Sequence, residues 1–186
     1  MKQIVLATSN PHKVEEINAI VEGIEFILPP EEFDPNENGT TFEENSLIKA
    51  KEANLLTGKI TLADDSGLCV EYLNGEPGIH SARYAPTAQE RIDKLLKVLD
   101  GVENRKAKFV CVMTLLNSDG SILTQVRGEC YGQIDVSQKG KNGFGYDPIF
   151  IVDGYNQTMA ELSEEEKNKI SHRAKALEKI LEYLKV

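Results

Sequence analysis

Two stretches of the chain together supply acids, an amide and a lysine. The first contains Glu44, Asn45 and Lys49, and the second contains the adjacent acids Asp64 and Asp65. Carboxylates bind Mg²⁺ well because it is a hard cation that prefers oxygen ligands, and lysines neutralise phosphate oxygens that a metal does not reach. The residue types therefore indicate metal-assisted phosphate chemistry on a small anionic ligand.

A third polar cluster, Thr8-Ser9-Asn10-Pro11-His12-Lys13, follows an apolar run and contains a proline suited to the first turn of a helix. Free backbone N–H groups at a helix start attract an anion, and Lys13 would add a positive charge. The cluster lacks the glycines and the GK[ST] ending of a Walker loop, so a capped turn without a ligand is the alternative. We assign His12 to the surface.

The two acidic stretches also have interpretations that need no ligand. Glu44 and Thr41 fit a capping box, in which the glutamate returns to the N-cap amide. The sequence Asp64–Gly67 is favourable for a hairpin turn. However, adjacent acids after an apolar strand are costly unless water, metal or hydrogen bonds satisfy them. Because neighbouring side chains on extended backbone point to opposite faces, we expect only one of Asp64 and Asp65 to enter a site directly.

Residues suited to a nucleobase lie further along the chain. Phe144 and Tyr146 occupy a glycine-containing loop, and an aromatic side chain between glycines offers a flat platform for stacking a base. His172 and Arg173 supply donors that can read an exocyclic oxygen. In the alternative interpretation the aromatics close the edge of the core, the donors decorate a helix, and Lys167 is a surface lysine.

Composition limits the classes of function. The 186 residues suffice for one folding unit, and the 40% hydrophobic and 27% charged residues are ordinary for a globular protein. The net charge of −9 opposes binding along a nucleic acid. Apolar runs such as 109–116 are too short to span a bilayer, so we expect no membrane partner. With three cysteines in no CxxC pattern and no secretory signal pattern, we expect a cytoplasmic protein.

Hydrophobic periodicity and turn residues predict an alternation of strands and helices that places the polar clusters at element ends. The expected strands are 3–8, 25–28, 60–63, 68–72, 106–117, 122–132 and 149–152, with the Asp64–Gly67 turn joining the third and fourth and a hairpin turn at 118–120. The expected helices begin after Asn10, Thr41, Thr87 and Ser163, and the last has a break near Ser171. Loops are expected at 29–39, 74–86 and 140–148.

Six motifs occur in order along the chain: SNPHK, TFEENSLIKA, ADDSGL, PGIHSARY, FGYDPIF and AEL followed by EEKNKISHR. Together they resemble the Ham1/RdgB family of inosine triphosphate pyrophosphatases over nearly the whole chain. The resemblance implies an α/β fold, with a long twisted mixed β-sheet flanked by helices, two lobes and an active site in the cleft between them. It also implies a single domain over 1–186 and a homodimer.

The resemblance implies Mg²⁺-dependent hydrolysis of ITP, dITP and XTP to the monophosphate and pyrophosphate, which keeps these non-standard purine nucleotides out of DNA and RNA. Mg²⁺ would be bound by Glu44 and Asp65, and Asp65 would also activate the water. The substrate would be bound by Thr8, Ser9, Asn10, Pro11, His12, Lys13, Lys49, Ser66, Arg83, Phe144, Gly145, Tyr146, Asp147, Lys167, His172 and Arg173. Ser46 is one departure, since the family commonly has alanine there.

Two other functions stay open. Maf-like nucleotide pyrophosphatases share the implied fold, but their opening loop carries paired arginines where this chain has only Lys13 as a strong cation. A non-catalytic nucleotide sensor would bind the triphosphate without cleaving it.

Donors aimed at a 6-oxo group would reject adenine, because its amino group would leave them unpaired. Guanine shares the 6-oxo group, and the residues do not indicate how it would be excluded.

Overall fold

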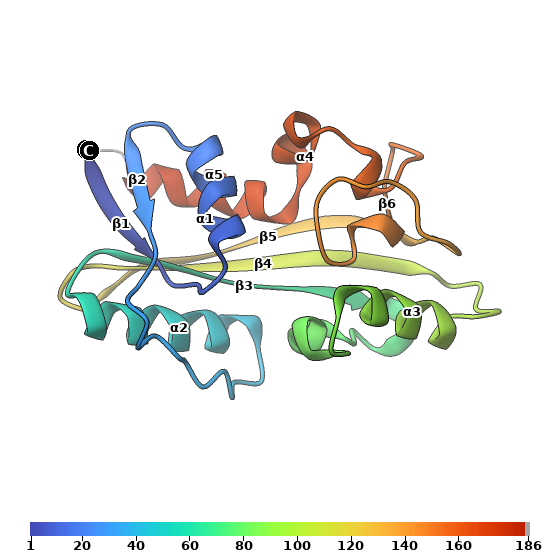
Figure 1. Ribbon diagram of the computed structural model, residues 1–186, viewed down its shortest axis with the longest axis horizontal. Coiled ribbons are helices and arrows are strands. Elements are labelled where there is room, and N and C mark those ends of the chain that lie inside the picture. Colours follow the sequence, from blue (N-terminus) through green and yellow to red (C-terminus); the bar gives the residue numbers. More distant parts are fainter. Residues whose placement is uncertain (185–186) are drawn as a thin grey trace. The chain divides into compact units, whose positions relative to one another are not determined.

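A mixed sheet with the strand order β2-β1-β3-β4-β5-β6 runs through the computed structural model, which describes residues 1–184 (Figure 1). The strands are β1 (Lys2–Leu6), β2 (Ile24–Ile27), β3 (Thr61–Val70), β4 (Lys106–Leu116), β5 (Ile122–Ile134) and β6 (Phe150–Val152). β1 pairs in parallel with β2 and β3, whereas β5 and β6 are antiparallel. The predicted α/β class with a mixed sheet is confirmed.

Five α-helices and four short 3₁₀ helices connect the strands within residues 1–184. The α-helices are α1 (Pro11–Ile20), α2 (Phe42–Thr57), α3 (Ala88–Val98), α4 (Glu164–Ile170) and α5 (His172–Leu184). The 3₁₀ helices are η1 (Glu71–Leu73), η2 (Gly78–Arg83), η3 (Asp147–Ile149) and η4 (Met159–Glu161). None of the helices in this described part is long and apolar enough to cross a membrane.

Side-chain caps explain where the helices begin. The hydroxyl of Thr41 accepts a hydrogen bond from the Glu44 N–H at the start of α2, and Thr87 and Glu90 form a complete capping box before α3. Ser163 accepts in the same way from the third residue of α4. Each cap satisfies a backbone donor that has no partner within its helix. The predicted helix starts are therefore confirmed, as is the break at Ser171 between α4 and α5.

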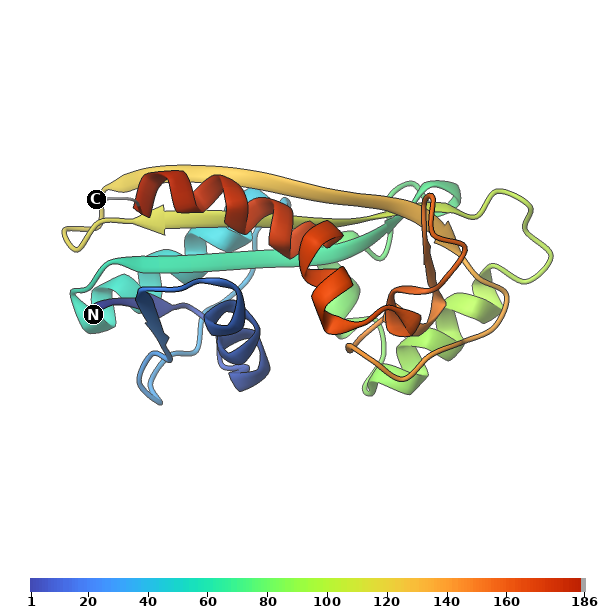
Figure 2. The ribbon, with the colours of Figure 1, turned by 90° about the horizontal axis from the view of Figure 1, so that it is seen from above.

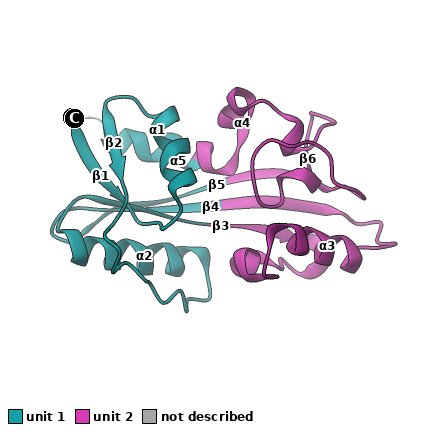
Figure 3. Ribbon diagram, viewed as in Figure 1, with its two compact units in different colours: residues 1–65, 111–128, 176–186 teal, residues 66–110, 129–175 magenta. Residues whose placement is uncertain are grey.

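The chain divides into two compact units (Figure 3). Unit 1 comprises residues 1–65, 111–128 and 176–186, and unit 2 comprises residues 66–110 and 129–175. Strands β3, β4 and β5 each begin in one unit and end in the other. Each unit also has its own hydrophobic core.

Unit 1 has two apolar clusters, one on each face of its part of the sheet. α1 and α5 cover one face, where Ile17 of α1 and Ile180 of α5 pack against strand residues such as Ile4 (Figures 1 and 2). α2 covers the opposite face through Ala50 and Ala53. β1 and β3 thus lie between helices in unit 1, and residues 4–6 of β1 and 61–65 of β3 are all buried.

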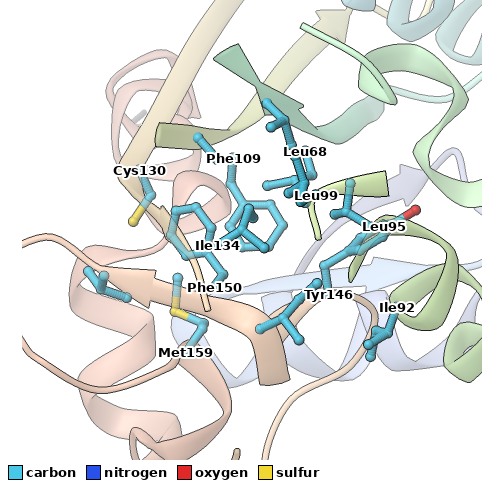
Figure 4. Close-up of a cluster of buried hydrophobic side chains, with 14 of the residues drawn as sticks. Leu68, Ile92, Leu95, Leu99, Phe109, Cys130, Ile134, Tyr146, Phe150 and Met159 are labelled. Atoms are coloured by element: carbon cyan, nitrogen blue, oxygen red, sulfur yellow. The ribbon is translucent and has the colours of Figure 1, made fainter. Parts of the chain in front are cut away.

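The core of unit 2 gathers side chains from α3, β3, β4, β5, β6 and the segments between them (Figure 4). Leu95 and Leu99 at the end of α3 meet Leu68 of β3 and Phe109 of β4. The Phe109 and Phe150 rings lie with their centroids 4.4 Å apart. Tyr146, in the loop that follows β5, and Ile149 belong to this core as well.

The predicted hairpin turn at Asp64–Gly67 is wrong. Residues 61–70 form one continuous strand, β3, which lies between β1 and β4 in the sheet. Turn propensity does not decide the conformation here, because the backbone of these residues belongs to a strand of the sheet. Lysines that are distant in sequence satisfy the two carboxylates. The predicted loops at 74–86 and 140–148 contain η2 and the start of η3.

Candidate active site

The two acids of β3 in unit 1 each hold a different lysine. Lys13 Nζ lies 3.2 Å from Asp64 Oδ2, and Lys49 Nζ lies 3.0 Å from Asp65 Oδ1. The predicted alternation along the strand is confirmed, since neighbouring carboxylates reach different partners. Both acids are buried. That only one of them enters a site directly stays a prediction.

The strand–helix junction that precedes Lys13 is a well-capped turn. Asn10 Oδ1 accepts a hydrogen bond of 3.0 Å from the His12 N–H, and Pro11 occupies the first turn of α1. Thr8 Oγ1 accepts from the Asn10 N–H at 3.1 Å. Ser9 is exposed, and His12 lies on the surface as predicted. The turn therefore fixes the direction in which α1 leaves β1.

Glu37 is a site residue that the sequence analysis missed. It lies in the acidic loop between β2 and α2, and its Oε1 is 3.2 Å from Lys49 Nζ. Lys49 thus joins two carboxylates, those of Glu37 and Asp65. One glutamate among the several acids of this loop matches no local pattern. The nearby Gly39, where the chain returns to α2, is the one signal that pointed to a fixed loop.

Glu44 has a structural partner at the start of α2. Its Oε2 accepts hydrogen bonds from the Thr40 N–H at 2.6 Å and from Thr40 Oγ1 at 3.1 Å. The glutamate side chain therefore bonds to Thr40, the residue before the N-cap. The predicted capping box required a bond to the N-cap, Thr41, instead. Glu44 is otherwise exposed.

Burial and charge shape the ionisation of this cluster. Burial raises the pKa of Asp65 to about 6, although Lys49 acts in the opposite direction. Burial alone would lower the pKa of Lys49, but the carboxylates of Asp64, Asp65 and Glu37 outweigh it and the pKa is raised. The Oδ2 atom of Asp65 is buried and has no hydrogen-bond partner among residues 1–184. Such an atom is costly unless a ligand satisfies it.

In the metal-free protein we expect the Asp65 carboxyl to titrate near pH 6, being neutral below that pH and charged above it. Carbon-13 NMR of the side-chain carboxyl groups measures this directly, with the spectrum of Asp65→Asn identifying the resonance. A midpoint near the ordinary value for aspartate, about 4, would show that burial does not control this group.

The carboxylates suit a magnesium ion that retains some of its water. Residues 1–184 contain no cluster of three or more His, Cys, Asp or Glu side chains arranged to hold a metal. Mg²⁺ is commonly bound by only one or two carboxylates together with waters and substrate phosphates. The partnerless Oδ2 of Asp65, with Glu37 on the same lysine, fits that pattern.

In unit 2 a buried ion pair holds the loop that contains Phe144. Asp147 Oδ2 accepts a hydrogen bond of 2.8 Å from Lys167 Nζ and one of 3.1 Å from the Phe144 N–H. Burial raises the pKa of Asp147, and Lys167 counteracts part of that rise. A side chain at Gly143 would overlap Asp147 Oδ2, so the loop closes tightly over this carboxylate. Lys167 is buried, and the alternative that it is a surface lysine is excluded.

The ring of Phe144 is the accessible aromatic surface in this loop. It is 44% exposed, and Lys167 Nζ and the guanidinium carbon of Arg173 lie 4.7 and 5.5 Å from its centroid. Tyr146 is buried instead, and its hydroxyl donates to the Ser81 carbonyl at 2.7 Å. Burial raises the pKa of that hydroxyl. The alternative that an aromatic of this loop closes the edge of the core is therefore confirmed for Tyr146, and its binding of substrate stays a prediction.

Four further predicted residues, Ser66, Arg83, Gly145 and His172, belong to unit 2. His172 begins α5, is buried, and stacks on Phe109 with ring centroids 4.7 Å apart. Gly145 has a positive φ of 62°. Ser66 is half-buried directly after Asp65, and Arg83 is exposed at the end of η2. The structure thus groups Lys13, Lys49, Asp64, Asp65 and Glu37 within unit 1, and Phe144, Asp147, Lys167 and Arg173 within unit 2.

Comparison with known proteins identifies the family. The model of the Ham1 family matches residues 4–183 of the chain. The chain belongs to the Ham1 family. A Bacillus licheniformis protein named dITP/XTP pyrophosphatase is 46% identical over 193 residues, covering 97% of this chain and 96% of the relative. A Synechocystis protein of the same name is 44% identical, covering 97% and 94%.

Solved structures of the Ham1 family share this fold. The Ham1 protein of Staphylococcus aureus superposes with a TM-score of 0.89 at 42% identity, covering 98% of each chain. A Ham1 protein from Coxiella burnetii gives a TM-score of 0.88 at 43% identity, covering 99% of this chain and 98% of the other. The order of strands and helices is therefore that of the family.

Proposed function

We propose that this Ham1 family chain hydrolyses non-standard purine nucleoside triphosphates, dITP, XTP and ITP, to the monophosphate and pyrophosphate with Mg²⁺. The observation that carries the proposal is the Asp65 carboxylate, which has one oxygen on Lys49 and a second, buried oxygen without a hydrogen-bond partner among residues 1–184. The relatives named dITP/XTP pyrophosphatase support the choice of substrates. Hydrolysis would keep these nucleotides out of DNA and RNA.

Lys13 and Lys49 are the proposed phosphate-binding cations. Each lies beside a carboxylate of β3. An ammonium group has three N–H donors, so Lys49 can donate to a phosphate oxygen while it keeps its hydrogen bond to Asp65. Charge moves to the leaving pyrophosphate during phosphoryl transfer, and fixed cations stabilise it there. The backbone N–H groups at the start of α1 add donors for the same oxygens.

For the metal we propose Asp65 and Glu37 as protein ligands, and not Asp65 and Glu44. Glu37 shares Lys49 with Asp65, whereas Glu44 is engaged by Thr40. When bound, Mg²⁺ supplies positive charge to phosphate oxygens that the lysines do not reach. Its other ligands would be waters and the substrate's own phosphates.

Asp65 is the proposed general base. In the metal-free protein the pKa of Asp65 is about 6, so its carboxylate is mostly ionised at neutral pH and can accept a proton. The hydrogen bond from Lys49 fixes Oδ1 and leaves Oδ2 for the attacking water.

The purine is assigned to the residues of unit 2. Phe144 offers a ring face for stacking, and Lys167, His172 and Arg173 supply donors suited to a 6-oxo group. Adenine presents a 6-amino group, which would leave those donors unpaired, so ATP is the disfavoured nucleotide. The family resemblance also supports a homodimer that acts in the cytoplasm.

The test is pyrophosphate release from dITP, XTP, ITP, GTP, ATP, dTTP and UTP, with and without Mg²⁺. We expect rapid release from the first three, slow release from GTP and ATP, and little release without the metal. Fastest turnover of dTTP or UTP would identify a Maf-like activity. Tight binding of dITP without pyrophosphate release would identify a sensor.

A further inference from the structure

Residues Gly39 and Thr40 are docked on the first turn of α2 by side chains of that helix. The Gly39 N–H donates to Asn45 Oδ1 at 2.8 Å, and the Thr40 N–H donates to Glu44 Oε2 at 2.6 Å. Asn45 is buried, so its amide oxygen has little water to replace this donor. Two successive backbone donors are thus held by two successive side chains.

This contact of residues 39–40 with the first turn of α2, called the dock below, is closely packed as well as hydrogen-bonded. A Cβ atom at Gly39 would lie 2.7 Å from Asn45 Oδ1 and 2.7 Å from Glu44 Cβ. Those distances are shorter than van der Waals contact, so no side chain fits at this position without moving the segment. The φ of Gly39 lies outside the left-handed region, so backbone conformation does not require a glycine at this position. Lack of space for a side chain does.

The same segment carries Glu37, whose carboxylate meets Lys49 one helical turn beyond Asn45. α2 therefore holds the segment at its first turn and receives the Glu37 carboxylate at its second. Fixing residues 39 and 40 restricts the backbone that leads to Glu37. The conformational entropy lost in placing the Glu37 carboxylate beside Asp65 is therefore lost when the chain folds, and not when the metal binds.

We propose that Glu44 and Asn45 are positioning residues, which dock residues 39–40 so that Glu37 is presented together with Asp65 to the metal. The proposal rests on the proposed function, which makes Glu37 a metal ligand. It gives Glu44 a role that depends on accepting a hydrogen bond and not on its charge. Residues that orient a metal ligand typically change metal affinity or activity by about 10- to 100-fold when they are removed.

The test compares Glu44→Ala, Glu44→Gln and Gly39→Ala with the unchanged protein, with Glu43→Ala as the matched control. Glu43 is the neighbouring glutamate in the same turn of α2 and pairs with Arg127 on the surface. We expect Glu44→Ala and Gly39→Ala to raise the Mg²⁺ concentration for half-maximal pyrophosphate release by roughly 10-fold. Glu44→Gln keeps an acceptor oxygen and should recover most of that loss, and Glu43→Ala should resemble the unchanged protein.

Two measurements do not depend on turnover. Titration with Mn²⁺ alone, followed by electron paramagnetic resonance, should show weaker binding in Glu44→Ala and Gly39→Ala. Amide hydrogen exchange by NMR should show faster exchange at Thr40 in Glu44→Ala, with the thermal midpoint close to that of the unchanged protein.

If Glu44→Gln loses Mn²⁺ as severely as Glu44→Ala while exchange at Thr40 stays slow, Glu44 is itself a ligand and the positioning role is overturned. If Gly39→Ala binds Mn²⁺ like the unchanged protein, the dock does not position Glu37. Glu37→Gln separates this from the function itself: normal Mn²⁺ binding in that variant would refute the assignment of Glu37 as a ligand, whatever the other variants do.

Discussion

Asp65→Asn is expected to lower turnover of dITP by roughly 10³-fold, within the range for loss of a general base. The asparagine has almost the same shape as the aspartate but cannot accept a proton, and it binds a cation more weakly. Lys49 keeps Glu37 as a partner in this variant, so the phosphate site retains its main cation. We therefore expect the KM for dITP to change much less than kcat.

Asp135→Asn is the matched control, because Asp135 and Asp65 are both 7% exposed and each pairs with a lysine. Pyrophosphate release under steady-state conditions gives kcat and KM, and binding of a non-hydrolysable dITP analogue gives affinity. Asp65→Asn with unchanged turnover would rule out its assigned role. Equal losses in both variants would point to a general effect on stability.

Asp147→Asn is expected to destabilise unit 2 by about 3 kcal/mol or more, because breaking a buried ion pair leaves Lys167 charged and uncompensated. The change also weakens the acceptor for the Phe144 N–H. We therefore expect a higher KM for dITP together with the loss of stability. The chain contains no tryptophan, so urea unfolding is best followed by circular dichroism.

The double variant Asp147→Asn, Lys167→Met provides the control for that prediction. It contains no unpaired charge at the buried position, so its stability should be higher than that of Asp147→Asn alone. Its KM for dITP should stay high, since the loop is still without its carboxylate and the proposed purine site has lost the Lys167 donor. The single variant Lys167→Met completes the comparison. If the stability lost by the double variant equals the sum of the losses in Asp147→Asn and Lys167→Met, the two residues do not act as a pair.

Features set by neighbouring residues were predictable from the sequence. The starts of α2, α3 and α4 follow from a hydroxyl that accepts the N–H of the residue three positions later, as at Thr41, Thr87 and Ser163. The hairpin between β4 and β5 likewise follows from its turn residues. Family motifs predicted Lys13, Lys49 and Asp65 as residues of one site, because the order of the motifs along the chain is itself distinctive.

Features set by distant residues were not predictable in this way. Asp64 and Asp65 stay within a continuous strand because Lys13 and Lys49, far from them in sequence, satisfy their charges. Tyr146 has an aromatic ring that could stack on a base, but it is buried in the core, where its hydroxyl donates a hydrogen bond to the Ser81 carbonyl. Glu37 reaches the site through a loop whose path depends on a dock against α2.

The arrangement of unit 1 has a consequence for how the chain folds as it is synthesised. Its core joins Ile4 and Leu6 of β1 to Leu177 and Ile180 of α5, residues from opposite ends of the described chain. Closing such contacts requires nearly the whole polypeptide, and proteins rich in long-range contacts fold slowly. The apolar faces of β1 and α1 therefore stay uncovered on the ribosome until α5 emerges, and during that interval they are candidates for chaperone binding.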